Sequence, residues 1–517
     1  MEITQILLSI TLCFITLLYI IHIFFFKTKT TVFSFKKYPI LGTIPDFLSN
    51  RHRFLEWTTH ILSSIPSHTA VFYRPVGGTH GVITANPANV EHILKTRFEN
   101  YPKGPRFLSV LHDFLGTGIF NADGPLWRLQ RKTASFAFSM RTLRNFLLNA
   151  VQTEIISRLN PILEEACGLN RVLDLQDVLE RFAFDNVCKL AFNVDPGCLN
   201  RSGSSESEFM RAFNEATELS SGRFLYGLPM LWKIKKLFKY GSEKKLKKSI
   251  KNVHEFAEQI IRLRIEEKKT KKNDYEDLLS RFLDCIEEED INRSSLSSTK
   301  FLRDVVISVI LAGKDTTSTG LSWLFWLLSL NPNVVEKIRV EIDMIRVRSK
   351  KMVGLTYDYE ELQEMHYLHA VISESLRLYP PVPVDTKACL KDDILPDGTR
   401  VKNGWFVMYH IYAMGRMEDI WGEDCYEFKP ERWLENKVYK PNSPFRYPIF
   451  HAGPRVCLGK EMAYIQMKSI VASMVEQYDV DVLEKEKRPD YLLSLTLRMK
   501  NGLSVRLKKR IVHHMNA

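Results

Sequence analysis

One apolar run, residues 301–330, constrains the fold of this 517-residue chain more than any other stretch. The run has the pattern of a single helix, which Asn331-Pro332 ends because proline cannot continue a helix. At about 1.5 Å per residue, a helix of this length spans roughly 45 Å. The chain must therefore form a domain wide enough to cover the helix along its whole length.

The middle of this helix is polar, which is costly in a buried position. It reads Ala312-Gly313-Lys314-Asp315-Thr316-Thr317-Ser318. A threonine can bend a helix by donating to a carbonyl of the preceding turn, and a glycine allows the helix to open. We expect a widened groove that holds a small molecule, with Thr316 and Asp315 handling protons. The competing interpretation is an ordinary helix junction that one of these side chains caps.

Residues 30–517 read as one domain that is mainly α with a minor β-sheet region. From residue 88 onward the pattern is largely helical, and it includes a strong helix over 368–378. β-Branched residues around Gly77-Gly78 predict a hairpin over 71–84, and strand-like segments return at 400–409 and 492–507. No linker rich in proline, glycine and serine divides the chain into separate units.

The N-terminal residues predict a membrane anchor. Residues 6–26 contain His22 but no charged side chain, and about 20 apolar residues suffice to cross a bilayer. A cleaved signal peptide is the weaker alternative, because its start should be basic and Glu2 stands here. Four lysines follow between residues 27 and 37, so the positive-inside rule places the rest of the chain in the cytosol. We predict a single-pass anchor over residues 1–29.

A surplus of basic residues gives the chain a net charge of +12, which narrows the class of partner. Because no nucleic-acid-binding motif is present, we expect no nucleic acid but an anionic membrane surface or an acidic protein. Residues 222–251 place aromatic and apolar side chains before a lysine-rich stretch, which suits a second contact with membrane lipid. A solvated helix face is the alternative. The eight cysteines form no CxxC pair, which indicates reduced thiols.

One of these cysteines stands in a setting that suits a metal ligand. The stretch reads Phe450-His451-Ala452-Gly453-Pro454-Arg455-Val456-Cys457-Leu458-Gly459, and an apolar, helix-like run over 462–475 follows. Glycines on both sides favour a tight loop. Such a loop can present the single thiolate of Cys457 to a bound metal centre.

Two further motifs place polar side chains on one helix face. Trp127 and Arg131 are four residues apart, so both can donate to one anionic group, although a packed tryptophan beside a solvated arginine is the commoner arrangement. Glu374 and Arg377 are three apart, and Pro430-Glu431-Arg432-Trp433 can complete a buried network with them through its arginine. The alternative for this second pair is an exposed contact of little energetic value.

Taken in order, these four motifs resemble those of the cytochrome P-450 monooxygenases over roughly residues 30–510. Residues 445–463 and the polar helix stretch followed by Trp323-Leu324-Phe325-Trp326-Leu327-Leu328 are similar to the plant fatty-acid omega-hydroxylase branch. Asn121-Ala122-Asp123-Gly124 before Trp127 fits as well. Within that branch the chain resembles family ninety-four, whose members oxidise the methyl end of fatty acids or of jasmonoyl-isoleucine.

The resemblance implies that residues 30–517 form a haem-thiolate monooxygenase domain that binds haem b. Cys457 would be the axial ligand of the iron, and the helix after it would aim N–H groups toward the sulfur. Phe450 would pack over the sulfur, and Gly453 would let the backbone approach the porphyrin. Ala312 and Gly313 would border the cofactor in the groove of the long helix.

The haem propionates need donors, which the resemblance assigns to Arg455, Trp127 and Arg131 because an arginine meets a carboxylate as a planar fork. Lys387 falls where many members have an arginine for the same purpose. Thr316 would hold ordered water in the groove, and Asp315 would relay protons from the surface.

The implied co-substrates are O2 and NADPH, whose electrons arrive through the membrane-bound NADPH–cytochrome P-450 reductase. Its acidic docking face suits a basic chain. The microsomal members that carry an N-terminal anchor lie in the endoplasmic reticulum membrane with the catalytic domain in the cytosol, and we expect the same here.

The substrate is expected to be a hydrophobic small molecule, either a fatty acid or a jasmonate–amino-acid conjugate. Its wall would come from residues 107–120, 309–312, 382–385 and 495–497, and Arg106 could meet a carboxylate at the mouth. A haem-thiolate isomerase of hydroperoxides and a membrane-anchored haem protein without turnover are the other interpretations. Asp315-Thr316 argues against the isomerase, because such enzymes commonly lack this pair.

Overall fold

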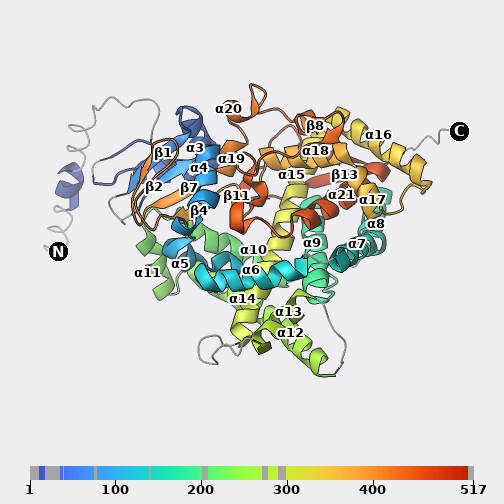
Figure 1. Ribbon diagram of the computed structural model, residues 1–517, viewed down its shortest axis with the longest axis horizontal. Coiled ribbons are helices and arrows are strands. Elements are labelled where there is room, and N and C mark those ends of the chain that lie inside the picture. Colours follow the sequence, from blue (N-terminus) through green and yellow to red (C-terminus); the bar gives the residue numbers. More distant parts are fainter. Residues whose placement is uncertain are drawn as a thin grey trace.

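The predicted long helix runs through the middle of the molecule in the computed structural model, which describes residues 11–17, 35–38, 40–74, 79–138, 141–200, 208–270, 277–288 and 298–510 (Figure 1). It consists of α14 (Ser298–Ile310), a π-helical turn η7 (Leu311–Asp315) and α15 (Thr316–Leu330). Thr316 Oγ1 donates to the Ala312 carbonyl oxygen at 2.6 Å. The predicted opening of the helix is therefore confirmed, since a π turn widens the helix where the polar residues stand.

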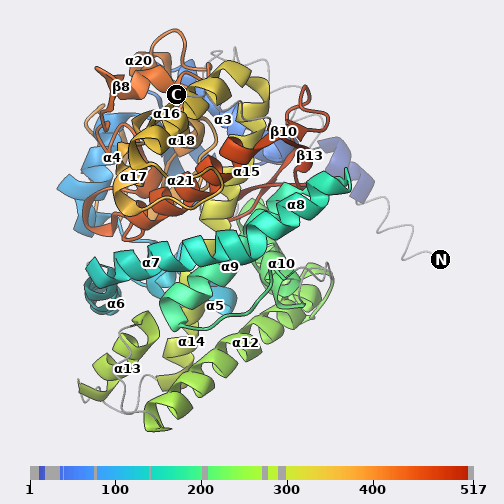
Figure 2. The ribbon, with the colours of Figure 1, turned by 90° about the vertical axis from the view of Figure 1, so that its right-hand side faces the viewer.

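Helices cover this central element on all sides in both views (Figures 1 and 2). Figure 2 shows α7, α8 and α9 between an upper group with α16, α18 and α21 and a lower group with α12 and α13. The helices are α2 (Ile44–Asn50), α3 (Phe54–Ser63), α4 (Pro87–Glu91), α5 (Gly104–Leu115), α6 (Gly124–Phe138), α7 (Arg141–Glu154), α8 (Asn160–Gly168), α9 (Leu175–Phe192), α10 (Glu208–Gly222), α11 (Pro229–Leu237), α12 (Ser242–Thr270), α13 (Leu278–Glu288), α16 (Pro332–Ser349), α17 (Tyr359–Glu364), α18 (His366–Leu378), α19 (Ile411–Met414), α20 (Glu418–Trp421) and α21 (Lys460–Gln477).

A four-stranded sheet lies beside the helices, in the order β1-β2-β7-β4 (Figure 1). Its strands are β1 (Thr69–Arg74), β2 (Thr79–Thr84), β7 (Phe406–Tyr409) and β4 (Asp385–Ala388). The smaller sheets use β3 (Leu173–Asp174), β5 (Asp393–Ile394), β6 (Arg400–Val401), β8 (Leu434–Glu435), β9 (Val438–Tyr439), β10 (Tyr478–Val482), β11 (Tyr491–Leu493), β12 (Leu497–Met499) and β13 (Ser504–Lys509). The predicted hairpin and the C-terminal strands are present, and the prediction of a mainly α fold with a minor sheet is confirmed.

The network expected around Glu374 is buried and more extensive than the sequence indicated. Arg377 donates to both carboxylate oxygens of Glu374 at 2.8 Å, and neither side chain has any solvent exposure. Arg432 and Trp433 donate to the same carboxylate at 2.8 and 2.9 Å. Arg377 also donates to the carbonyl of Cys425 at 2.6 Å, so the network connects α18 to the segment that leads into the cysteine loop.

Most of the predicted membrane anchor lies outside the described residues. Only residues 11–17 of it are described, and they form a helix. Within the described ranges, no helix is both long and apolar enough to cross a bilayer.

Candidate active site

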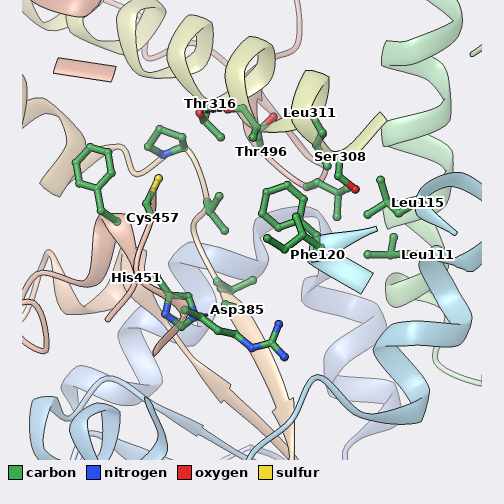
Figure 3. Close-up of a pocket in the computed structure, with 18 of the residues that line it drawn as sticks. Leu111, Leu115, Phe120, Ser308, Leu311, Thr316, Asp385, His451, Cys457 and Thr496 are labelled. Atoms are coloured by element: carbon green, nitrogen blue, oxygen red, sulfur yellow. Dashed lines mark hydrogen bonds and ion pairs between the residues drawn. The ribbon is translucent and has the colours of Figure 1, made fainter. Parts of the chain in front are cut away.

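A cavity of about 520 Å³ lies between the long helix, the cysteine loop and the four-stranded sheet. Cys457 and Thr316 lie on opposite sides of one end of it, which we call the cysteine end (Figure 3). Leu111, Leu115 and Phe120 line the other end, which we call the apolar end (Figure 3). The four wall segments that the sequence predicted, 107–120, 309–312, 382–385 and 495–497, each contribute lining residues.

The cysteine loop, residues 448–459, is held by its own backbone. The Cys457 N–H donates to the Phe450 carbonyl oxygen at 2.8 Å and closes the loop. His451 has a φ of 61°, a strained value for a residue with a side chain. The Cys457 side chain borders the cavity and is exposed to that space. Desolvation by the surrounding protein raises the pKa of the thiol, and a hydrogen bond from the Gly459 backbone and the charge of Arg131 oppose that shift.

Phe450 lies where the sequence predicted, on the cavity wall, with its ring 5.4 Å from that of Tyr464 in α21. Gly453 has a packing role in addition to the predicted approach to the porphyrin, which stays a prediction. Its φ is 64°, and a Cβ there would lie 2.0 Å from the carbonyl oxygen of Leu94. The residue does not line the cavity, so the lack of a side chain lets the loop pack against a neighbouring helix.

Ala312 and Gly313 both line the cavity in the π-helical turn. A Cβ on Gly313 would lie 2.4 Å from Cγ2 of Val187, in α9. The glycine therefore also permits the close packing of two helices, which the sequence analysis did not foresee.

Three predicted donors come together at one edge of the cavity. The Arg455 guanidinium lies 4.4 Å above the ring of Trp127 and donates to Asp123 at 2.7 Å. Arg131 lies one turn beyond Trp127 on α6 and has no carboxylate partner among the described residues. Burial lowers the pKa of Arg131, and the nearby Cys457 opposes that shift. The two arginines and the indole can therefore donate to an anionic group at this edge.

Lys387 is not on the cavity wall, and the prediction that it contacts a cofactor finds no support in its position. It is buried, with Nζ 3.4 Å from Oδ2 of Asp385, and burial lowers its pKa to about 7. A lysine that shares its charge with an adjacent carboxylate is a weak donor to a second anion. Lys103 and His451 line the cavity instead.

Asp385, expected only as part of the cavity wall, is the centre of a cluster of charged and polar side chains. Lys103 and Tyr409 donate to it at 2.7 Å each, and His451 Nε2 lies 3.4 Å away. Burial alone would raise the pKa of Asp385, but Lys103, Lys387 and His451 hold it well below its usual value. The carboxylate thus ties β4 to the strained residue of the cysteine loop (Figure 3). The only signal in the sequence was an acid and a lysine at alternate positions of a strand.

Thr316 and Asp315 face different surroundings. Thr316 lines the cavity, whereas Asp315 lies in a buried cluster with Lys314, Glu180 and Arg498. Burial raises the pKa of Asp315, although Lys314 opposes the shift. Arg498 is 31% exposed and pairs with Glu180, so the cluster connects the neighbourhood of the cavity with the surface.

A thiol at the end of an apolar cavity, opposite a threonine in an opened helix, defines a haem-thiolate enzyme. The chain belongs to the cytochrome P450 family, because the family model described as Cytochrome P450 matches residues 35–505. It is therefore a cytochrome P450 monooxygenase, which uses haem b, O2, electrons derived from NADPH and a reductase partner.

Comparison with curated relatives shows which branch of the cytochrome P450 family the chain resembles. The chain is 49% identical to Cytochrome P450 CYP94D108 of Paris polyphylla, over 91% of each chain. It is 46% identical to Cytochrome P450 94A1 of Vicia sativa, over 92% of this chain and 90% of that one. It is 44% identical to Cytochrome P450 94B1 of Arabidopsis thaliana, over 94% and 95%. These likenesses place the chain in the family-94 branch of plant members.

The residues present fit a haem. The thiol of Cys457, which is open to the cavity, would hold the haem iron, and Arg131, whose guanidinium has no described carboxylate partner, lies at the edge where Arg455 and Trp127 would also meet the propionates. Gly459 leaves the sulfur uncovered, since the nearest atom to a Cβ there would be the sulfur of Cys457 at 3.9 Å. An apolar wall then excludes water from the space above.

Proposed function

We propose that this enzyme hydroxylates fatty acids at or near the terminal carbon. The observation that carries the proposal is the cavity wall, which is mainly apolar between the cysteine end and the apolar end. A long acyl chain satisfies such a wall, because it has no polar group to leave unpaired. The resemblance to omega-hydroxylases points to the same class.

In this proposal Cys457 holds the haem iron, and Arg455, Arg131 and Trp127 donate to the propionates. When bound, the haem supplies the activation of O2 and the insertion of an oxygen atom into an unactivated C–H bond. The protein positions the substrate carbon beside Thr316 and keeps water out. Phe450 would pack over the sulfur and keep water away from it.

Thr316 and Asp315 are proposed to deliver protons. The Thr316 hydroxyl donates to the Ala312 carbonyl, so its oxygen is free to accept from water on the cavity side. Burial raises the pKa of Asp315, which favours a carboxyl that takes a proton from water and passes it inward, and Arg498, 31% exposed, marks the side from which water reaches the cluster. Thr316→Ala should keep the thiolate spectrum but divert NADPH toward peroxide. Ser322→Ala, which removes a similar bond in the same helix at 2.8 Å, should not. Full product yield from Thr316→Ala would count against the proton role.

The partner is proposed to be the membrane-bound NADPH–cytochrome P-450 reductase. The net charge of +12 supports docking to an acidic face, and the exposed Lys95 and Lys460 lie close to the cysteine loop. Electrostatic docking weakens as salt screens the charges. NADPH consumption with this reductase should therefore slow as ionic strength rises, and a rate independent of salt would argue against it.

The enzyme is proposed to sit in the endoplasmic reticulum membrane through residues 1–29, with its catalytic domain in the cytosol. A patch of exposed apolar side chains supports a second contact with lipid: Met230, Leu231, Ile234, Leu237 and Phe238. Leu48, also exposed, lies against Gly227 just before this patch. Full-length protein should resist carbonate extraction from microsomes and remain accessible to protease from the cytosolic side. Protection of the domain from protease would contradict the orientation.

The decisive experiment incubates the enzyme with reductase and NADPH against saturated and unsaturated fatty acids and jasmonoyl-isoleucine, with products mapped by mass spectrometry. Terminal or near-terminal hydroxy fatty acids support the proposal. Turnover of jasmonoyl-isoleucine alone would replace it with hormone oxidation. If no substrate stimulates NADPH consumption, the result would favour an isomerase that needs no reductase or a haem protein without turnover.

A further inference from the structure

Two half-buried arginines on the cavity wall lack, among the described residues, the acidic partners that fully buried arginines such as Arg377 have. Arg74 is the last residue of β1, and Arg106 lies in the first turn of α5. No carboxylate in the described part of the chain pairs with either of them. Elsewhere the most buried arginines pair with acids, as in Arg223–Glu243, Arg346–Glu476 and Arg377–Glu374.

Aromatic rings hold the two guanidinium groups in place. Arg74 lies 4.2 Å from the ring centroid of Phe47 and 5.2 Å from that of Phe72. Arg106 lies 5.2 Å from the ring centroid of Phe406, which itself packs edge-on against Phe72. Such contacts stabilise a cation through the faces of the rings but accept none of its N–H groups. The Arg74 Nε is buried and has no hydrogen-bond partner among the residues that the structure describes.

The two arginines also repel each other. Burial lowers the pKa of Arg74 to about 10, and the charge of Arg106 contributes to that shift. Burial lowers the pKa of Arg106 as well. Arg74 nevertheless stays protonated near neutral pH. Two like charges on one cavity wall, one of them with a buried Nε that lacks a described partner, are costly, and an anion placed between them would relieve both costs.

The arginine pair stands well away from the cysteine end. Thr69, Thr84, Tyr409 and Asp385 form one row across the sheet, and Asp385 contacts His451 of the cysteine loop. Arg74 is five residues farther along β1, which corresponds to about 17 Å at the rise of a strand. An anion at the arginine pair is thus separated from Cys457 by much of the length of the sheet.

We propose that Arg74 and Arg106 bind the carboxylate of the substrate, so that the enzyme holds its substrate by the acid group and presents the far end of the chain to the cysteine end. The planar guanidinium groups match a carboxylate in a way that a lysine would not. The assignment rests on the proposed function, since it needs a substrate with one acid group and an apolar chain. A free fatty acid and an amino-acid conjugate both satisfy it.

The test compares acids with their methyl esters, which keep the apolar chain and lose the charge. Binding is measured by the spectral shift on titration of the purified full-length holoenzyme with dodecanoic acid, methyl dodecanoate, jasmonoyl-isoleucine and its methyl ester. The wild type should bind at least one acid about tenfold or more tightly than its ester, because a charge-assisted pair is lost in the ester. Which acid shows the preference distinguishes the two sources of the carboxylate.

The variants Arg74→Gln and Arg106→Gln should each weaken binding of that acid about tenfold and leave binding of the ester within a factor of about two. Arg74→Lys keeps the charge without the fork, so its acid binding should fall between that of the wild type and Arg74→Gln. Arg400→Gln, at an exposed position outside the cavity, is the matched control and should bind acid and ester like the wild type.

Equal losses for acid and ester in both glutamine variants would overturn the inference, because they indicate a structural role. A wild type that does not prefer the acid to the ester, or that binds no acid, would overturn it as well. Failure of the proposed function looks different: acids bind in an arginine-dependent manner, but no terminally hydroxylated product forms with reductase and NADPH.

Discussion

The cysteine end and the apolar end of the cavity are built in different ways, although the long helix borders both. At the cysteine end, a strained backbone at His451, a closed loop at Cys457 and the buried carboxylate of Asp385 fix one geometry. At the apolar end, the cavity wall is formed by apolar side chains such as Leu111 and Phe120. Polar networks tolerate few arrangements, whereas apolar side chains can repack. Changes at the first end should therefore abolish function, and changes at the second should redirect it.

The largest expected effect is at the sulfur itself. Cys457→Ala should abolish the red-shifted Soret band of the reduced carbonyl complex and all turnover, because no other described cysteine borders the cavity. Cys167→Ala, which removes a free thiol far from the cavity in α8, should keep both. An unchanged spectrum in Cys457→Ala would contradict the assignment of Cys457 as the iron ligand. It would also contradict the contrast between the two ends of the cavity.

The next largest effect is expected behind the cysteine loop. Glu374→Gln leaves Arg377 buried without a countercharge, because Arg432 keeps Asp424 as a partner at 3.1 Å, and this should cost about 3–5 kcal/mol of unfolding free energy. Glu431→Gln makes the same change in an exposed pair with Lys337 and should cost about 1 kcal/mol or less. Urea unfolding of the two variants, followed by circular dichroism, measures the difference. Equal losses would show that the buried network does not hold the cysteine end.

What could be predicted from the sequence follows the same division. Motifs at the cysteine end are local, so spacing alone indicated that Glu374 and Arg377 share a face and that Thr316 bends the long helix. The glycines on both sides of Cys457 likewise indicated a tight loop. The fold class followed from helical periodicity, and the wall segments followed from the family resemblance.

Contacts between distant segments could not be predicted. Lys103 and Asp385 are 282 positions apart, and no pattern within either segment indicates that they meet. Gly453 was expected to approach a cofactor, but the close neighbour is Leu94, on a helix far away in the sequence. The pairing of Arg74 with Arg106 also depends on how β1 and α5 pack. A lone arginine carries no signal of a missing partner, because most arginines are solvated.

A smaller effect on the cysteine end should appear with pH. His369 is stacked between Tyr439 and Tyr464, with centroids 3.9 Å from each, and burial lowers its pKa to about 2 from 6.5. Between these two pH values His369 is protonated in the unfolded chain but neutral in the folded protein. The free energy of unfolding therefore falls as the pH drops from about 6.5 toward 2. At pH 5.5 the loss from this group is about 1.4 kcal/mol.

Urea midpoints at pH 7.5 and pH 5.5 measure this dependence. In His369→Phe the loss on acidification should shrink by that amount, whereas His52→Phe, at an exposed position, should behave like the wild type. The other buried histidines titrate equally in all three proteins and cancel in the comparison. An unaltered pH dependence in His369→Phe would show that this stack does not contribute to the rigidity of the cysteine end.

The smallest effect is expected at the apolar end, where Phe120 lines the cavity and keeps 38% of its surface exposed. Phe120→Ala removes a ring that the core does not need, so the carbonyl spectrum and the unfolding midpoint should stay as in the wild type. The acyl chain gains room near the ring, and apolar contacts discriminate between neighbouring carbons only weakly. We expect the ratio of terminal to subterminal hydroxylation to change several-fold, while total turnover falls less than about tenfold.

Product analysis by mass spectrometry measures the ratio, with Phe136→Ala, outside the cavity, as the matched control. A complete loss of activity in Phe120→Ala would mean that the apolar end is as rigidly specified as the cysteine end, because the position of the substrate would then depend on a single ring.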